Sequence, residues 1–129
     1  MKKEFSKSWK ASKQPRKQRK YIKKSPLHLR NKLVSAHLSK DLMKKYLIRN
    51  IPLRKGDKVS IMRGKFKKTT GTVTDVNLKK LRIFVSGAEI VKKDGSKSPI
   101  PLHPSKLMIT ELVSDDKRRF KNIIKEAKK

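Results

Sequence analysis

The chain has 129 residues, of which 38 are Lys or Arg and only 10 are Asp or Glu, and its formal net charge is +28. Because such a chain repels itself unless a polyanion neutralises it, we expect it to work in a complex with nucleic acid. It has no cysteine, which excludes disulfides, thiol catalysis and cysteine-ligated zinc. It also has no apolar run of about eighteen residues, so membrane insertion is not expected.

Residues 1–24 are a basic arm with one acidic residue and no periodic apolar pattern. The arm cannot collapse by itself, so we predict that it is disordered until it binds RNA. Trp9 and Tyr21 can stack on unpaired bases, or pack against ribose or protein. A localisation signal or a solubilising tail is the alternative explanation for the charges. The cations expected to contact phosphates are Lys13, Arg16, Lys17, Arg19, Lys20, Lys23 and Lys24.

Residues 25–52 contain two helix starts. Ser25 followed by Pro26 is typical of a cap with proline at the first helical position, and Ser39 before Asp41 is typical of a second cap. Each helix would have too few turns to persist alone in water, so we expect both to pack on a folded domain or on RNA.

Residues 53–113 have the pattern of the folded domain. All five glycines lie there, where turns between short strands need residues that tolerate positive φ. Alternating apolar residues predict about five antiparallel strands and a small, partly closed barrel, so the fold class is mainly β. A turn is expected at 93–96 and an irregular, proline-containing connection at 99–104. The alternating residues are Val59, Ile61, Val73, Val76, Ile83, Val85, Leu107 and Ile109.

Residues 114–129 predict a terminal amphipathic helix. Asp115 and Asp116 favour a helix start after Ser114, because acidic side chains are stabilised at that end of a helix. Apolar residues then share one helical face, at Phe120, Ile123, Ile124 and Ala127.

The loop between Gly64 and Gly71 is the strongest candidate binding site. Lys65, Lys67 and Lys68 surround Phe66, so the turn would present ammonium groups and unpaired backbone amides to a phosphate backbone. The alternative is an ordinary hairpin whose lysines are only solvated. A nucleotide-binding loop is not indicated, because threonines stand where that pattern needs glycine and lysine.

The sequence shows no constellation for catalysis or metal binding. His28, His37 and His103 are scattered, with no carboxylate or cysteine at ligand spacing. The aspartates fit turns and caps, and a serine nucleophile motif is absent. We therefore expect no enzyme activity, no cofactor, no metal and no small-molecule substrate.

Residues 55–76 resemble the KOW motif, the strand–loop–strand signature shared by ribosomal proteins and transcription elongation factors. The flanking sequences resemble the archaeal and eukaryotic form of the universal large-subunit ribosomal protein family twenty-four, called twenty-six in eukaryotes. The resemblance runs from about residue 10 to residue 113. The flanking matches are residues 12–20 (SKQPRKQRK), 26–30 (PLHLR), 38–42 (LSKDL) with Lys45 and Tyr46, and 103–106 (HPSK).

The resemblance implies an SH3-like barrel that carries the KOW motif and binds the first domain of the large-subunit rRNA near the polypeptide exit tunnel. It also implies a scaffolding role early in subunit assembly, in the cytoplasm, with neighbouring large-subunit proteins as partners. The family's RNA-facing loop corresponds to residues 63–68, which begin with Arg63 and Gly64. Its proline-flanked turn corresponds to residues 103–106. Further candidates for RNA contact are His28, Arg30, Arg54, Lys55, Lys79, Lys80, His103 and Lys106.

The family usually has glycine where Lys68 stands. If this position needs a positive φ, the loop cannot have the family's backbone freedom. One hypothesis is that the added charge compensates through a phosphate contact.

Two other functions remain open from the sequence. A regulatory KOW protein that binds RNA polymerase and nascent RNA would need a second domain for the polymerase, and this short, basic chain leaves little room for one. A chromatin protein that compacts DNA would bind duplex DNA and rRNA with similar affinity at equal salt, whereas a ribosomal protein would prefer folded rRNA.

Overall fold

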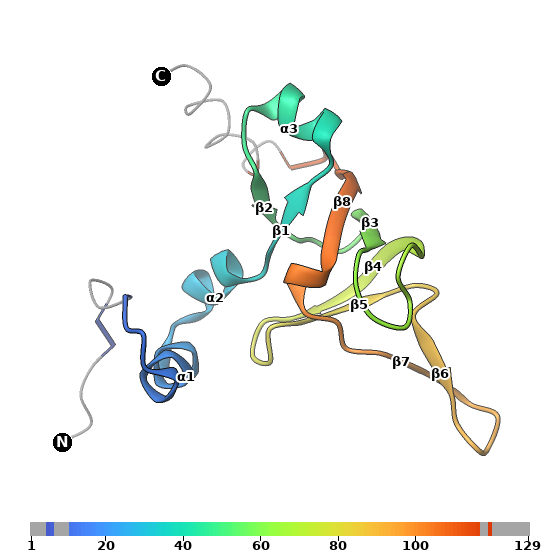
Figure 1. The fold of residues 1–129 in the computed structure, drawn as a ribbon, viewed down its shortest axis with the longest axis horizontal. Coiled ribbons are helices and arrows are strands. Elements are labelled where there is room, and N and C mark those ends of the chain that lie inside the picture. The colour runs from blue at the N-terminus through green and yellow to red at the C-terminus, as the bar shows by residue number, and fades with distance from the viewer. Residues whose placement is uncertain (1–4, 7–10, 117–118, 120–129) are drawn as a thin grey trace.

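The computed structural model describes residues 5–6, 11–116 and 119. A six-stranded sheet has the order β2-β1-β8-β3-β4-β5, and a separate hairpin, β6-β7, projects from the body (Figure 1). The strands are β1 (Ser35–Leu38), β2 (Asn50–Pro52), β3 (Lys58–Ile61), β4 (Thr70–Asn77), β5 (Arg82–Val85), β6 (Glu89–Val91), β7 (Lys97–Pro99) and β8 (Leu107–Glu111). The helices are α1 (Pro15–Lys24), α2 (Leu27–Leu33), α3 (Lys40–Tyr46) and the 3-10 helix η1 (Pro104–Lys106).

The strands expected from the alternating residues are present. Val59 lies in β3, Ile83 in β5, and Leu107 and Ile109 in β8, and all four are 0% exposed. The turn expected at 93–96 joins β6 to β7, and the proline-containing connection leads through η1 into β8. The prediction of a mainly β fold is confirmed.

The sheet is mixed, which corrects the prediction of a purely antiparallel sheet. β1 pairs in parallel with β8, where His37 lies opposite Met108 and Leu38 opposite Ile109, and β2 pairs antiparallel with β1. Both added strands come from the stretch 25–52, in which the sequence indicates helices only. The signal for β1 is weak because the strand has four residues and only one large buried apolar side chain, that of Leu38.

β4 gives the sheet a barrel-like curl. Its first half pairs with β3 and its second half with β5, with a shift of register on the β5 side. An isolated bridge between Ile83 and Leu102 then links β5 to the chain before η1. Gly71 permits the close approach of β4 to the chain just after β5, because a Cβ at that position would lie 2.2 Å from the carbonyl oxygen of Ser86.

The hydrophobic core extends beyond residues 53–113. Val34, Ala36, Leu38 and Ile51 are buried in the same cluster as the residues of β3, β5 and β8. The segment that carries β1 and β2 is therefore part of the sheet and its core, and not only an appended pair of helices.

α1 lies within the arm for which the sequence predicts disorder before RNA binding, and over Pro15–Lys24 the structure has a helix. Pro15 occupies the first turn, where its missing N–H is not needed. Ile22 packs against the hydrophobic core, and the Lys23 carbonyl accepts a hydrogen bond from Arg30 at 2.6 Å. Tertiary contacts at the C-terminal end thus stabilise a helix whose charge pattern alone argues against folding.

α2 and α3 occupy the stretch where two helices are expected, but only α3 has the predicted cap. The Ser39 hydroxyl accepts a hydrogen bond from the Leu42 N–H at 3.4 Å. Ser25 does not cap α2, because its hydroxyl donates to the Ile22 carbonyl at 2.7 Å and Pro26 precedes the helix. Ser25 therefore ends α1 instead of starting α2.

The helix predicted for residues 114–129 lies mostly outside the described residues, and Trp9 also lies outside them. Arg119 is described, and its side chain is only 4% exposed. Within the described ranges, no helix has both the length and the apolar character needed to cross a membrane.

Candidate nucleic-acid interface

Backbone hydrogen bonds join the two ends of the loop between β3 and β4. The Ile61 N–H donates to the Thr69 carbonyl at 2.9 Å, and the Lys68 N–H donates to the Ile61 carbonyl at 2.8 Å. Gly64 has a φ of +96°, and a Cβ there would meet nothing within 4 Å, so the backbone conformation and not space favours glycine. The Lys67 N–H donates back to the Gly64 carbonyl at 3.0 Å.

The loop turns its cations outward and its phenylalanine inward. Arg63, Lys65, Lys67 and Lys68 are exposed, whereas Phe66 is half-buried and packs against the hydrophobic core. Phe66, a predicted RNA-facing residue, therefore anchors the loop, and the cations are left to face solvent. This arrangement suits a phosphate backbone, which is contacted by charge and hydrogen bonds and not by stacking.

Lys68 has a left-handed backbone conformation, with a φ of 70°. This is the position at which the family resemblance leads us to expect glycine. A side chain in this region costs about 1 to 2 kcal/mol relative to the right-handed conformation, and glycine avoids that cost. The chain thus keeps the glycine-type conformation and adds an ammonium group.

The turn at η1 adjoins the loop. The Met62 N–H, just after β3, donates to the Lys106 carbonyl at 2.8 Å. Pro104 is buried, while His103 and Lys106 are exposed on its two sides in the chain. The predicted loop and the predicted turn therefore lie together. We call them the loop–turn surface, defined as Arg63, Lys65, Lys67, Lys68, His103 and Lys106.

His103 begins the turn and caps η1. Its Nδ1 lies 2.8 Å from the Ser105 hydroxyl oxygen and 3.3 Å from the Ser105 backbone nitrogen. Partial burial lowers the pKa of His103 below its ordinary value of 6.5, and the charges of Arg82 and Lys106 lower it further. Arg82 is not among the predicted site residues, because it comes near His103 through the bridge between its neighbour Ile83 and Leu102, the residue before the turn.

Arg30 brings together a second group of cations. Its Nη2 donates to the Lys23 carbonyl at 2.6 Å and its Nε to the Ser25 carbonyl at 2.9 Å, while its Nη1 lies 3.5 Å from the Lys79 carbonyl oxygen. Arg30, which was predicted to contact RNA, thus holds the end of α1 beside the turn between β4 and β5. We call the exposed lysines gathered there the arm–turn surface, defined as Lys23, Lys24, Lys79 and Lys80.

The other described residues predicted to bind RNA are exposed, and most lie on or near α1. Arg54 differs, because its guanidinium forms an ion pair with Asp116 at 2.5 Å. Lys55 is exposed in the turn before β3. The cations on or just before α1 are Lys13, Arg16, Lys17, Arg19 and Lys20, and His28 lies in α2.

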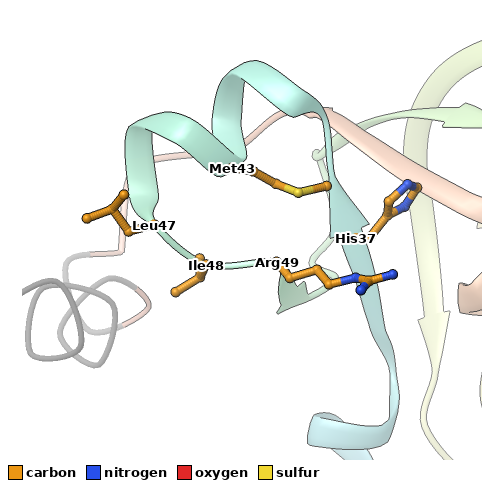
Figure 2. Close-up of a pocket in the computed structure, with 5 residues that line it drawn as sticks. All are labelled: His37, Met43, Leu47, Ile48 and Arg49. Carbon is orange, nitrogen blue, oxygen red and sulfur yellow. The ribbon is translucent and has the colours of Figure 1, made fainter.

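An open pocket of about 390 Å³ lies between α3 and β1 (Figure 2). Its lining is mostly apolar and consists of His37, Met43, Leu47, Ile48 and Arg49, none of them a predicted site residue. In the part of the chain that the structure describes, no group of three or more His, Cys, Asp or Glu could hold a metal ion.

Comparison with known proteins agrees with the resemblance seen in the sequence. A model of the family described as ribosomal proteins L26 in eukaryotes and L24 in archaea matches residues 12–126. One relative, the large ribosomal subunit protein uL24 of Methanosphaera stadtmanae, is 52% identical over 108 residues, which are 84% of this chain and 92% of that protein. The chain therefore belongs to the family of eukaryotic ribosomal proteins L26 and archaeal ribosomal proteins L24.

Proposed function

We propose that this protein is a structural component of the large ribosomal subunit that binds large-subunit rRNA. The contact would be with the first rRNA domain near the polypeptide exit tunnel, and the protein would assist early subunit assembly. The observation that carries the proposal is the loop–turn surface, whose exposed cations stand on a hydrogen-bonded base. The name of the uL24 relative supports the large subunit, and we infer from it a location in the cytoplasmic ribosome.

The cationic surfaces would neutralise phosphates of folded RNA. Duplex RNA hides its bases in a deep, narrow groove, so a protein with many cations and 5% aromatic residues recognises shape, phosphates and 2′-hydroxyls. Counterions released from the RNA supply much of the affinity, which falls as salt rises. The fixed backbone of the loop would hold the cations in defined positions, so that they match the phosphates of some RNA folds better than those of others.

The arm–turn surface would hold a second stretch of the RNA. Because Arg30 fixes the end of α1 beside the β4–β5 turn, the lysines there have a defined position relative to the sheet. Once one surface is bound, the other meets its RNA segment at a high effective concentration. The protein would thereby stabilise an RNA fold during assembly, next to neighbouring large-subunit proteins as further partners.

We also infer that residues 53–113 are an SH3-like barrel and that β3, its loop and β4 are the KOW motif. The curl of β4 and the strand–loop–strand arrangement support this inference. Residues 1–24 would be the RNA-binding arm, 25–52 the helical segment and 114–129 a C-terminal helix. Since 34–51 share the core, the barrel needs that segment to be complete.

The alternative functions have less support. A KOW-type elongation regulator that binds polymerase and nascent RNA is not favoured, because the matching family is one of ribosomal proteins. The members of the matching ribosomal protein family are structural proteins and not enzymes, so we propose no catalytic activity and no cofactor.

The test is a titration of the full chain with large-subunit rRNA from the same cells, at several salt concentrations. The loop variant replaces Lys65, Lys67 and Lys68 with alanine. The control variant replaces Lys92, Lys93 and Lys97, which are exposed on the β6–β7 hairpin. We expect the loop variant to bind more weakly, with a salt slope flatter by about 2 to 3, since about 0.7 to 0.9 of a counterion is released per neutralised phosphate.

Two results would contradict the proposal. Equal losses in the loop and control variants would show that only total charge matters. Equal affinity of the wild-type protein for duplex DNA and for rRNA at the same salt would favour the chromatin function.

A further inference from the structure

We propose that His103 binds rRNA as a neutral imidazole, whose Nε2–H donates a hydrogen bond to a phosphate oxygen. This inference rests on the proposed function and adds to it a contact of a different kind from the lysines. In this proposal, one residue of the loop–turn surface recognises the RNA through the geometry of a hydrogen bond and not through its charge.

The hydrogen bonds of the turn fix which ring nitrogen carries the proton. The Ser105 backbone N–H donates to Nδ1 of His103 at 3.3 Å. A backbone amide can only donate, so Nδ1 must offer a lone pair. The Ser105 hydroxyl, 2.8 Å from the same nitrogen, must then donate as well. A neutral imidazole has one N–H, so the proton lies on Nε2.

The surroundings of the ring also favour the neutral form. A second proton would have to enter on Nδ1, where it would oppose the Ser105 N–H and abolish the cap of η1. Partial burial and the charges of Arg82 and Lys106 also lower the pKa of His103. In the free protein at neutral pH the ring is therefore an uncharged donor held in one orientation.

The position of the ring points to a phosphate as the acceptor. The His103 side chain is exposed, with Lys106 at the other end of the same turn. The backbone bond from Met62 to Lys106 places the loop lysines next to this turn. An anionic oxygen is the acceptor that these cations attract, and a fixed N–H adds a directional bond to the same group.

A hydrogen bond from a neutral donor should respond to salt differently from the contacts of the neighbouring lysines. A lysine that meets a phosphate releases a counterion, so its contribution falls as salt rises. A neutral imidazole neutralises no charge, so its hydrogen bond should contribute the same factor at every salt concentration. The two kinds of contact can thus be distinguished on one surface.

Three variants of the full chain test this with the same rRNA. H103N keeps an acceptor close to the position of Nδ1 but cannot reach the position of Nε2. H103Q can place an N–H group near Nε2 but loses the cap. K106A removes a charge from the same turn and is the matched control.

We expect H103N to bind about tenfold more weakly at every salt concentration, with an unchanged slope. H103Q should recover most of the affinity although its turn is less stable. K106A should flatten the slope by about 0.7 to 0.9. Phosphorothioate substitution in the rRNA should identify a phosphate at which interference is present for the wild type and absent for H103N.

The proposal is overturned if H103N binds like the wild type, or if it flattens the slope as K106A does. It is also overturned if ¹⁵N NMR of the free protein finds the His103 proton on Nδ1. A wild-type protein that shows no preference for rRNA over duplex DNA would instead remove the proposed function, and the NMR result would still stand by itself.

Discussion

The carboxylate of Asp57 and the guanidinium of Arg119 form a two-point ion pair inside the protein, with nitrogen–oxygen distances of 2.7 and 2.6 Å. The two side chains are 0% and 4% exposed. Asp57 also accepts hydrogen bonds from the backbone N–H groups of Arg54 and Val113, and Arg119 donates to the Pro52 carbonyl. The pair therefore ties the chain before β3 to the chain after β8.

Replacing Asp57 with asparagine should destabilise the fold by about 3 to 5 kcal/mol, because the buried charge of Arg119 loses its partner. Urea unfolding measures this loss. The pair between Lys58 and Glu111 is a matched control, since its side chains are 57% and 65% exposed. E111Q should cost at most about 1 kcal/mol. Similar losses in D57N and E111Q would show that the inner pair does not form.

The sequence alone could not reveal this pair. Gly56 before Asp57 predicts a turn, and β3 does begin there, but the partner lies 62 positions away along the chain. The alternation around Val59 and Ile83 was sufficient to predict β3 and β5, because period two needs only local residues. β1 depends on its parallel partner β8, so its four residues carry little signal of their own.

Replacing Arg30 with alanine should loosen α1 while leaving the sheet folded. Four hydrogen bonds from the Arg30 guanidinium hold the end of the helix and reach the β4–β5 turn. Without them, a helix of ten residues is marginal in water. Trypsin should cleave within residues 16–24 about tenfold faster or more, as limited proteolysis measures.

The control for this experiment is R49A, which removes an exposed arginine from the connection between α3 and β2. It should leave cleavage within α1 unchanged. If R30A and R49A are cleaved at the same rate there, the carbonyl contacts of Arg30 do not stabilise the helix.

The sequence was sufficient to predict the two turns of the candidate site, but not that they lie side by side. The glycines around the loop and the prolines before β8 indicated two basic turns, and the bond from Met62 to Lys106 joins them. The position of Arg82 near the turn follows from strand pairing, and the inward position of Phe66 follows from core packing. Neither can be predicted from the local spacing of residues in the sequence. Arg30 is a type of residue that often binds phosphates, yet here its guanidinium donates to the backbone carbonyls of Lys23 and Ser25.

Replacing Lys68 with glycine should raise stability and lower rRNA affinity at once. Glycine removes about 1 kcal/mol of strain at a φ of 70°. The lost ammonium group should flatten the salt slope of binding by about 0.7 to 0.9. K67G is the matched control, because Lys67 has no positive φ. K67G should lower stability, since glycine there only adds freedom to the unfolded chain. A stability gain in both variants would contradict the strain argument.

Stability should decrease as pH falls below about 6.5, because partial burial and the charges of Arg82 and Lys106 lower the pKa of His103 in the folded state. At a pH between the folded and unfolded pKa values of His103, the unfolded chain binds more protons than the folded chain. The contribution of His103 to stability is therefore complete above the unfolded pKa and is lost as the pH falls through the folded pKa. Urea unfolding between about pH 8 and pH 5 measures this. H103N, which keeps a cap acceptor, should show a flatter profile. An unchanged profile would assign the titration to another group.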